Sequence, residues 1–374
     1  MPFDNKPILV FWETTKACPL NCIHCRAEAI GNPLPGELST LEGKALIDVV
    51  SSFGKPAPVI VFTGGDPLRR KDLFELLEYA KKKGVASAVA PAVSEDLTPS
   101  VLDRIKSSGV VSISLSLDST YGWKHDAIRR KAGTFDKTMN AIRYAKSIGL
   151  GIQINTTVMK SNMTELAKIF ALLKREDVRI WEVFFLINTG RGTMIDDISA
   201  AEYESACNFL YDASQYGILI RVVEGPFIRR VAKLRASQGA YWKNTDYLMM
   251  RKELVSEFGE STMKSTIPQS GTLDGDGIIF VSYNGTISPG GFTPETLGDI
   301  RSKNLVEVYR NDTRLVNIRS RRFNGECGSC EFKEICGGSR ARAYAGSKDL
   351  YGSDTACIRV TTTSLKEPTR RDNK

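Results

Sequence analysis

Three cysteines near the start of the chain carry its clearest chemical signal. Cys18, Cys22 and Cys25 lie in the segment TTKACPLNCIHCRAE, with the spacing C-x3-C-x2-C. Clustered thiols in a chain that keeps its cysteines reduced usually bind metal. A structural zinc site takes four protein ligands, whereas this loop offers three thiols and no neighbouring Asp. The spacing therefore favours a 4Fe–4S cluster with one iron open to an external ligand, and zinc is the alternative.

Four more cysteines gather near the other end of the chain. They follow the pattern C-x2-C-x5-C, with the last cysteine 21 residues further on: Cys327, Cys330, Cys336 and Cys357. Four thiolates suit either a structural zinc ion or a second cluster. Cys207 stands apart in the helical pattern AEYESACNFLYDA, where we expect an ordinary buried thiol.

Composition indicates a globular protein without a membrane segment. The chain has 374 residues, of which 42% are hydrophobic and 25% charged, so one large domain and a smaller one are expected. No apolar run is long enough to cross a bilayer, and no secretory signal is evident, which predicts a cytoplasmic protein.

The net charge of +8 is spread along the chain, which argues against a nucleic-acid partner. Local basic clusters occur at Arg229–Arg230, Arg319–Arg322 and Arg340–Arg342. We expect these clusters on solvated helix faces. The alternative is that they attract an anionic substrate or an acidic electron donor.

Apolar runs alternate with amphipathic stretches from about residue 8 to residue 224. Seven runs read as strands buried on both faces, at residues 8–13, 58–64, 85–90, 111–118, 151–158, 181–188 and 217–223. Repetition of strand and helix predicts an α/β fold with parallel units. About six such units predict a partial (β/α)6 barrel with its active site at the carboxyl ends of the strands.

The remaining residues divide by composition. We predict a core barrel over 1–224, a helical connector over 225–269, an auxiliary cysteine domain over 270–360 and a disordered tail over 361–374. The connector either caps the barrel mouth or links the two domains. The auxiliary domain should open with a β-hairpin that turns at Asn284–Gly285.

The cysteine triplet directly after the first predicted strand resembles the signature of the radical S-adenosylmethionine (SAM) superfamily. The resemblance implies that Cys18, Cys22 and Cys25 hold a catalytic 4Fe–4S cluster whose open iron binds the amino and carboxylate groups of SAM. It also implies that the reduced cluster cleaves SAM to methionine and a 5′-deoxyadenosyl radical, which abstracts a substrate hydrogen atom. A non-catalytic electron-transfer module is the alternative from another functional class.

Other segments resemble the SAM-binding positions of that family. Thr63, Gly64, Gly65 and Asp66 resemble its "GGE" motif, with Asp66 in place of Glu. The resemblance implies that this loop lies close to the methionyl amine, where small residues let the backbone approach. His24, before the third cysteine, would lie near the adenine.

Polar residues along the later strands complete the expected SAM site. Ser114, Ser116 and Asp118 alternate with apolar residues, so they share one strand face and would bind the ribose, or else form a polar strand end. Arg129 matches a family position that contacts the SAM carboxylate, or else is a surface arginine. The remaining cofactor-binding candidates are Gln153, Asn155, Leu186 and Arg191.

The late cysteines resemble the SPASM extension found in radical SAM enzymes, but with fewer cysteines. Gly290 and Arg340 stand where that extension usually has cysteines for a first auxiliary cluster. The resemblance therefore implies one auxiliary 4Fe–4S cluster, at Cys327, Cys330, Cys336 and Cys357, and two clusters in total.

The segment CGSCEFKEICGGSRARAYA is especially similar to the heme-biosynthesis branch, which includes heme synthase and heme d1 enzymes. That similarity implies oxidative decarboxylation of propionates on a tetrapyrrole, an anionic substrate. Crosslinking or maturation of a ribosomal peptide, and modification of a cofactor, remain alternatives. The implied electron donor is a ferredoxin or a flavodoxin.

Overall fold

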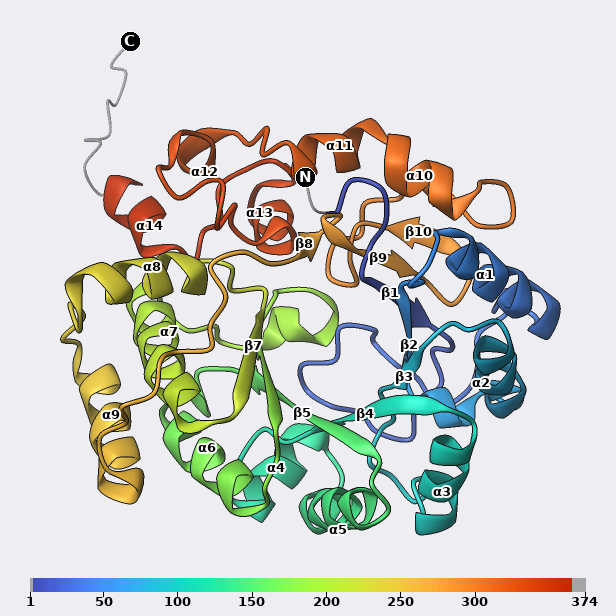
Figure 1. Ribbon diagram of the computed structural model, residues 1–374, viewed down its shortest axis with the longest axis horizontal. Helices are drawn as coiled ribbons and strands as arrows, with labels where there is room; N and C mark the ends of the chain where they lie inside the picture. The colour runs from blue at the N-terminus through green and yellow to red at the C-terminus, as the bar shows by residue number, and fades with distance from the viewer. Residues whose placement is uncertain (1–2, 365–374) are drawn as a thin grey trace.

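A computed structural model describes residues 3–364 of the chain and shows a curved, open, mostly parallel sheet (Figure 1). Seven strands lie side by side in chain order, each parallel to the next. They are β1 (Leu9–Glu13), β2 (Val59–Thr63), β3 (Ser87–Val89), β4 (Val110–Ser116), β5 (Gly151–Val158), β6 (Ile180–Phe185) and β7 (Leu219–Val223). The predicted partial barrel is confirmed, but with seven parallel strands in place of six, because each of the seven apolar runs forms a strand.

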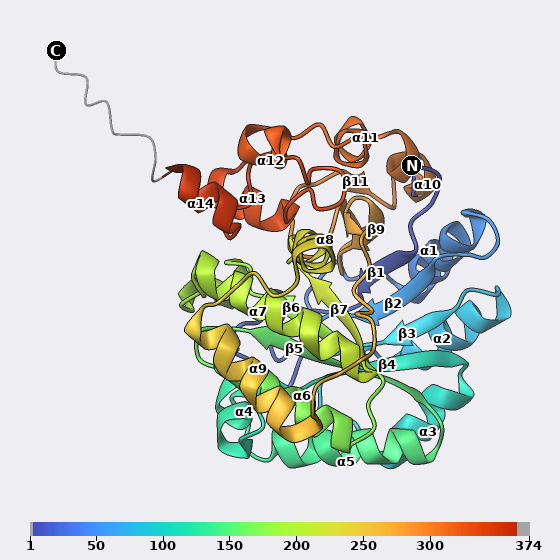
Figure 2. The same cartoon turned by 60° about the vertical axis from the view of Figure 1, so that its left-hand side comes forward.

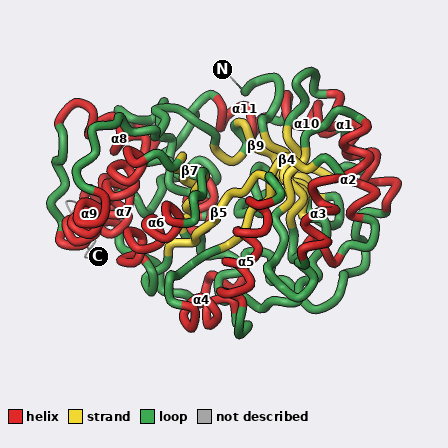
Figure 3. The backbone as a smooth tube through the Cα atoms, turned by 60° about the horizontal axis from the view of Figure 1, so that its bottom comes forward, coloured by secondary structure: helices red, strands yellow, loops and turns green. Residues whose placement is uncertain are grey.

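Helices cover the outer face of this sheet (Figure 3). They are α1 (Thr40–Ser52), α2 (Leu73–Lys82), α3 (Pro99–Ser107), α4 (Gly122–Arg129), α5 (Thr134–Ser147), α6 (Leu166–Arg175) and α7 (Ala200–Ala213). Capping boxes start α1 at Ser39 and α7 at Ser199, which satisfies the first free amide groups of each helix. Single 3-10 turns lie at Pro67–Arg69, Met163–Glu165, Gly190–Met194 and Ser214–Tyr216.

The core lies between the strands and these helices. Trp12 on β1 and Trp181 on β6 are fully buried, and the indole N–H of Trp181 donates to Thr156 Oγ1 (2.9 Å). Cys207 on α7 is fully buried as well. Among the described helices, none is long and apolar enough to cross a membrane.

The segment 225–269 holds two helices, α8 (Ile228–Gln238) and α9 (Thr245–Phe258). Both pack against α7, and α9 also packs against α6 (Figure 2). They therefore extend the outer helical layer, and Arg229 of α8 also donates to the carbonyls of Thr272 and Ile335 in the last part of the described chain.

The last part of the described chain, residues 270–364, is called the extension below. It is joined to the barrel sheet through a strand. It contains β8 (Leu273–Asp274), β9 (Gly277–Val281), β10 (Thr286–Ser288), β11 (Gly298–Asp299), α10 (Leu305–Asn311), α11 (Thr313–Arg319), α12 (Gly325–Ser329), α13 (Arg340–Ser347) and α14 (Ile358–Ser364). Strands β9 and β10 form the expected hairpin around Asn284–Gly285. Strand β9 also pairs in parallel with β1, which the sequence did not indicate.

The predicted disordered tail is wrong for its first four residues. Helix α14 runs to Ser364, so the chain is still helical over 361–364. The amide of Thr361 bonds to the carbonyl of Cys357, which carries the helix past the last cysteine. Residues 365–374 of that prediction lie outside the described residues.

Because β9 pairs with β1, we expect a cavity made in β9 to destabilise the barrel. Ile279 is fully buried on β9 opposite Val10, so Ile279→Ala should cost about 2–5 kcal/mol. Denaturant unfolding of the cluster-free chain, followed by tryptophan fluorescence to which the buried Trp12 and Trp181 contribute, should shift to lower denaturant. Val111→Ala, at a residue 54% exposed on β4, is the control and should change stability by about 0.5 kcal/mol or less. An unchanged fluorescence transition in Ile279→Ala would show that the extension unfolds independently.

Candidate active site

The first cysteine loop follows β1 and lines a cavity at the carboxyl ends of the barrel strands. Cys18, Cys22 and Cys25 are free thiols on the wall of this cavity, which has a volume of about 240 Å³. The amide of Leu20 donates to Cys18 Sγ (3.4 Å). Within residues 3–364 no three His, Cys, Asp or Glu side chains are grouped as ligands of one metal ion. The donor set of three sulfurs around an open cavity fits a three-thiolate cluster.

Arg191 holds the backbone of this loop in place. Its Nε donates to the carbonyl of Cys22 (2.8 Å) and its Nη1 to that of Ala29 (3.0 Å), while its own amide donates to the carbonyl of Cys25 (3.1 Å). Arg191, a predicted cofactor-binding residue, lines the cavity while its side chain also fixes the first cysteine loop. Leu186, at the end of β6, lines the same cavity.

The Gly-Gly loop after β2 packs directly on the cysteine loop. Thr63, Gly64 and Gly65 line the cavity. A Cβ at Gly64 would lie 2.5 Å from the carbonyl oxygen of Thr15, and one at Gly65 would lie 2.4 Å from that of Ala17. The glycines are therefore required for close contact between two loops, a role distinct from the expected approach of backbone to SAM.

Asp66 lies behind this wall, since it is fully buried and is not among the residues that line the cavity. Its Oδ1 accepts from the amides of Leu68 (3.1 Å) and Ala92 (3.2 Å), so it holds the Ala90–Val93 segment that forms another part of the wall. Burial raises the pKa of Asp66 to about 6. Its Oδ2 is buried without a hydrogen-bond partner among the described residues.

Polar residues of β4 and β5 divide between the cavity and the barrel interior. Ser114, Ser116 and Asn155 line the cavity, whereas Gln153 does not. Gln153 instead donates to Glu182 Oε2 (2.8 Å) and accepts from Arg221 Nη1 (3.0 Å), in a network deeper in the barrel. Burial raises the pKa of Glu182 to about 7.

Asp118 positions two cavity residues without lining the cavity. It is fully buried, binds the guanidinium of Arg129 and accepts from the amide of Thr157 (2.9 Å). His24 Nε2 lies 3.9 Å from Asp118 Oδ2, and Arg129 Nη1 lies 3.8 Å from Cys22 Sγ. Burial lowers the pKa of His24 to about 4, so its imidazole is neutral at pH 7, and its buried Nδ1 has no hydrogen-bond partner among the described residues. Unpartnered polar atoms on this wall fit a site built for a polar ligand.

Sequence reasoning missed one charged residue and several aromatic residues of the cavity. Arg26 lines it and donates to Glu13 Oε1 (3.1 Å) and to the carbonyl of Gly291 (3.0 Å). Its guanidinium lies 4.8 Å from the ring centre of Phe280 on β9. Phe184 and Phe292 also line the cavity. The position of Arg26 directly after Cys25 could have identified it from the sequence. Phe292 reaches the site only through tertiary packing, so the sequence held no such signal for it.

The four late cysteines surround a second cavity, of about 220 Å³, in the extension. The amide of Asp354 donates to Cys327 Sγ (3.4 Å) and that of Phe332 to Cys330 Sγ (3.4 Å). Cys336 and Cys357 complete the set of thiols. Amide donors aimed at sulfur are a common environment for iron–sulfur clusters, so the donor set fits such a group.

The two departures from the SPASM pattern have structural roles. A Cβ at Gly290 would lie 1.9 Å from the carboxyl carbon of Asp274, so a thiol has no room there. The guanidinium of Arg340 donates to the carbonyls of Gly337 (2.6 Å) and Gly352 (2.9 Å) and holds the loops that carry the late cysteines.

The expectation that the basic clusters lie on solvated helix faces is wrong for most of their members. Six of these arginines are buried: Arg229, Arg230, Arg319, Arg321, Arg340 and Arg342. They donate to main-chain carbonyls or pair with buried carboxylates, such as Arg230 with Glu204. The cause is that irregular segments leave many carbonyl groups that need donors.

Because Gly65 contacts backbone, we expect Gly65→Ala to displace the first cysteine loop. Overpacking of this kind costs about 1–3 kcal/mol and would displace the three thiols. The SAM cleavage to 5′-deoxyadenosine that the resemblance implies should therefore fall about tenfold or more. Gly31→Ala is the control, since nothing lies within 4 Å of a Cβ added there. Equal rates for the two variants, measured by chromatography under anaerobic reduction, would contradict this role of Gly65.

Comparisons with known proteins agree with this arrangement. A model of the radical SAM superfamily matches residues 12–173. An AdoMet-dependent heme synthase of Nitratidesulfovibrio vulgaris is 36% identical over 95% of this chain and 93% of that protein. One of Methanosarcina barkeri is 34% identical over 95% of this chain and 97% of that protein.

Among solved structures, Streptococcus suis SuiB bound to its precursor peptide SuiA shares the fold, with a TM-score of 0.68 and 15% identity. The alignment covers 95% of this chain and 76% of SuiB. The cysteine triplet, the open parallel barrel and the relatives across nearly the whole chain lead to one conclusion: this protein is an enzyme of the radical SAM superfamily.

Proposed function

We propose that this enzyme oxidatively decarboxylates propionate side chains of an iron-containing tetrapyrrole. The observation that carries the proposal is the identity of 36% and 34%, across 95% of the chain, with two AdoMet-dependent heme synthases. The charge of the cavity supports it. Arg26, Arg129 and Arg191 line the cavity, and none of the described residues on its wall is Asp or Glu. Such a wall favours a substrate that carries several carboxylates.

The proposed cofactors are SAM and two 4Fe–4S clusters. Cys18, Cys22 and Cys25 would hold the first cluster, and the four late cysteines the second. Bound SAM and the first cluster supply a radical that removes a hydrogen atom, and the second cluster supplies a one-electron acceptor. For each propionate, loss of one hydrogen atom, one electron and CO2 leaves a vinyl group, so atoms and charge balance.

The side chains of this chain would bind and orient the substrate. Arg26 is the proposed carboxylate contact at the mouth, because its guanidinium lies between the barrel and the extension. Phe184 and Phe292, whose ring centres are 6.4 Å apart, form an apolar wall suited to a flat macrocycle and would exclude water. Neutral His24 would face the SAM site as a hydrogen-bonding group.

The net charge of the chain supports a proposed redox partner, and the state of its thiols supports a proposed compartment. A net charge of +8 favours an acidic electron donor of the ferredoxin or flavodoxin class. All eight cysteines are free, which suits the reducing cytoplasm.

The test is anaerobic turnover with iron-coproporphyrin III, SAM and dithionite. We expect 5′-deoxyadenosine and a porphyrin that has lost CO2 and two hydrogens per reacted propionate, both read by mass spectrometry. Cys25→Ala should form neither product. Formation of 5′-deoxyadenosine with an unchanged porphyrin would reject the tetrapyrrole substrate and favour the peptide alternative.

The second cluster is tested by iron content. The anaerobically purified enzyme should hold about eight irons per chain, and Cys327→Ala about four. Cys207→Ala is the matched control, because this buried thiol lines neither cavity, and it should keep about eight. About four irons in the unsubstituted enzyme would mean that the late cysteines hold no cluster.

A further inference from the structure

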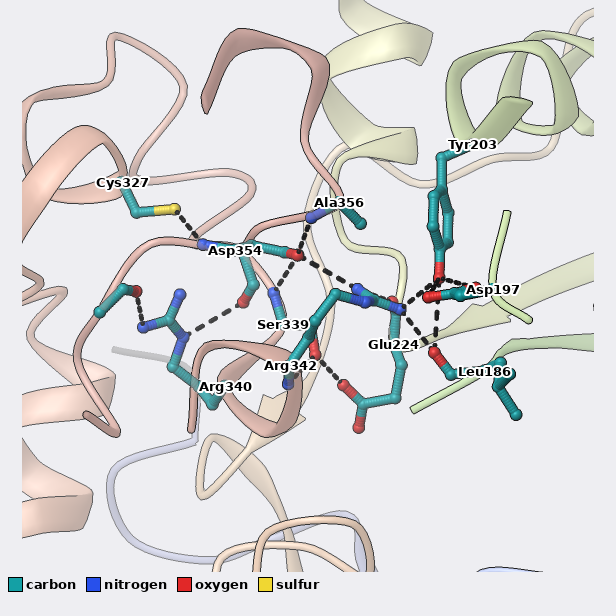
Figure 4. Close-up of polar contacts among 12 residues, drawn as sticks. Leu186, Asp197, Tyr203, Glu224, Cys327, Ser339, Arg340, Arg342, Asp354 and Ala356 are labelled. Carbon is teal, nitrogen blue, oxygen red and sulfur yellow. Dashed lines mark hydrogen bonds and ion pairs between the residues drawn. The ribbon is translucent and has the colours of Figure 1, made fainter. Parts of the chain in front are cut away.

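A single buried arginine contacts the structures around both cysteine cavities. Arg342 extends from α13 into the junction between the barrel and the extension, where it is 6% exposed (Figure 4). It lies over the ring of Tyr203 on α7, with the guanidinium carbon 4.8 Å from the ring centre.

On the barrel side, Arg342 binds the ends of the last two strands. Its Nη2 donates to the carbonyl of Leu186 (3.2 Å), a residue of the first cavity wall, and to Tyr203 Oη (3.2 Å). Its Nη1 donates to the carbonyl of Glu224 (2.9 Å), directly after β7. Any ligand that moves the Leu186 backbone must therefore also change the contacts of Arg342.

On the extension side, Arg342 pairs with a carboxylate next to the second cavity. Its Nη1 lies 3.2 Å from Asp354 Oδ1, and Asp354 is fully buried. The carboxylate also accepts from the amides of Ser339 (2.7 Å) and Ala356 (3.1 Å), while the amide of Asp354 itself donates to Cys327 Sγ (3.4 Å). A continuous series of polar contacts thus runs from Leu186 to the Cys327 sulfur.

We propose that Arg342 and Asp354 are positioning residues that couple the SAM and substrate cavity to the auxiliary cluster and set the reduction potential of that cluster. This inference rests on the proposed second cluster. A buried pair of opposite charges acts strongly on its surroundings because water does not screen it. The potential of an iron–sulfur cluster depends on nearby charge and on hydrogen bonds to its sulfurs, and this pair supplies both at Cys327.

Other buried arginines of the chain lack contacts with the structures around both cavities. Arg340, two residues earlier on α13, donates to main-chain carbonyls and also hydrogen-bonds Cys327, so its contacts lie around the second cavity alone. Arg235 on α8 forms a similar group with Asp212 on α7 and Tyr247 on α9. None of the three residues lines either cavity. Arg342 differs from both because it contacts the wall of the first cavity and, through Asp354, also reaches Cys327 in the second.

The test is an EPR-monitored redox titration of the holoenzyme, with the auxiliary signal assigned in the Cys18→Ala/Cys22→Ala/Cys25→Ala variant. Arg342→Gln removes a positive charge and should lower the midpoint potential of the auxiliary cluster. Asp354→Asn removes a negative charge, keeps the amide and should raise it. Arg235→Gln is the matched control and should leave it unchanged.

The link to the first cavity is tested by adding SAM to the holoenzyme. In the unsubstituted enzyme SAM should shift the auxiliary EPR signal, and in Arg342→Gln that shift should be lost. Arg342→Lys keeps the positive charge but loses the forked donors of the guanidinium. It should therefore restore the midpoint potential of the auxiliary cluster but not the response to SAM. The same variant replaces Arg342→Gln in the titration if Arg342→Gln does not fold.

Shifts of the same sign in Arg342→Gln and Asp354→Asn, or no response to SAM in the unsubstituted enzyme, would overturn the proposal. An enzyme with a single cluster would instead overturn the proposed second cluster.

Discussion

Both groups of cysteines lie mainly in irregular segments, and arginine side chains that donate to carbonyl groups there hold these segments in shape. Arg191 binds the carbonyls of Cys22 and Ala29, and Arg340 binds those of Gly337 and Gly338. A buried cation is costly unless its donors are satisfied, and a buried carbonyl is costly without a donor. Each arginine donates to such carbonyls, so the donors of the cation and the carbonyl acceptors are satisfied together. Cys18, Cys22 and Cys25 therefore keep their places outside regular secondary structure, whereas Cys327 lies on the short helix α12.

The open sheet explains why the extension reaches the active site. Because β7 does not close onto β1, the β1 edge is free to pair with β9. This pairing carries Phe280 and the Gly291–Phe292 segment to the first cysteine loop, where Arg26 contacts both. A closed barrel would leave no edge for this pairing. The incomplete barrel thus gives the cavity a wall from a distant part of the chain.

Burial acts differently on the charged groups of the two cavities. Burial lowers the pKa of His24 on the first cavity wall to about 4 and raises that of Asp66 behind the wall to about 6, because burial disfavours charge. Arg342 and Asp354 form a buried ion pair, and main-chain amides complete the contacts of the carboxylate. The first cavity thus offers cationic arginines and neutral polar groups to a ligand, while the junction holds a fixed dipole beside Cys327.

The sequence by itself determined the fold class, the repeated parallel strand–helix units and most of the first cavity wall. Parallel strands bring their carboxyl ends to one side, so residues just after each strand must meet there, as Cys18, Gly65 and Leu186 do. Local pattern also indicated the hairpin around Asn284–Gly285. Only the tertiary structure decided the pairing of β9 with β1, the burial of the basic clusters, and the positions of Asp66, Asp118 and Gln153 behind the wall. The physical reason is that spacing along the chain specifies which side of a strand a residue occupies, whereas burial and hydrogen-bond partners depend on segments far away in sequence.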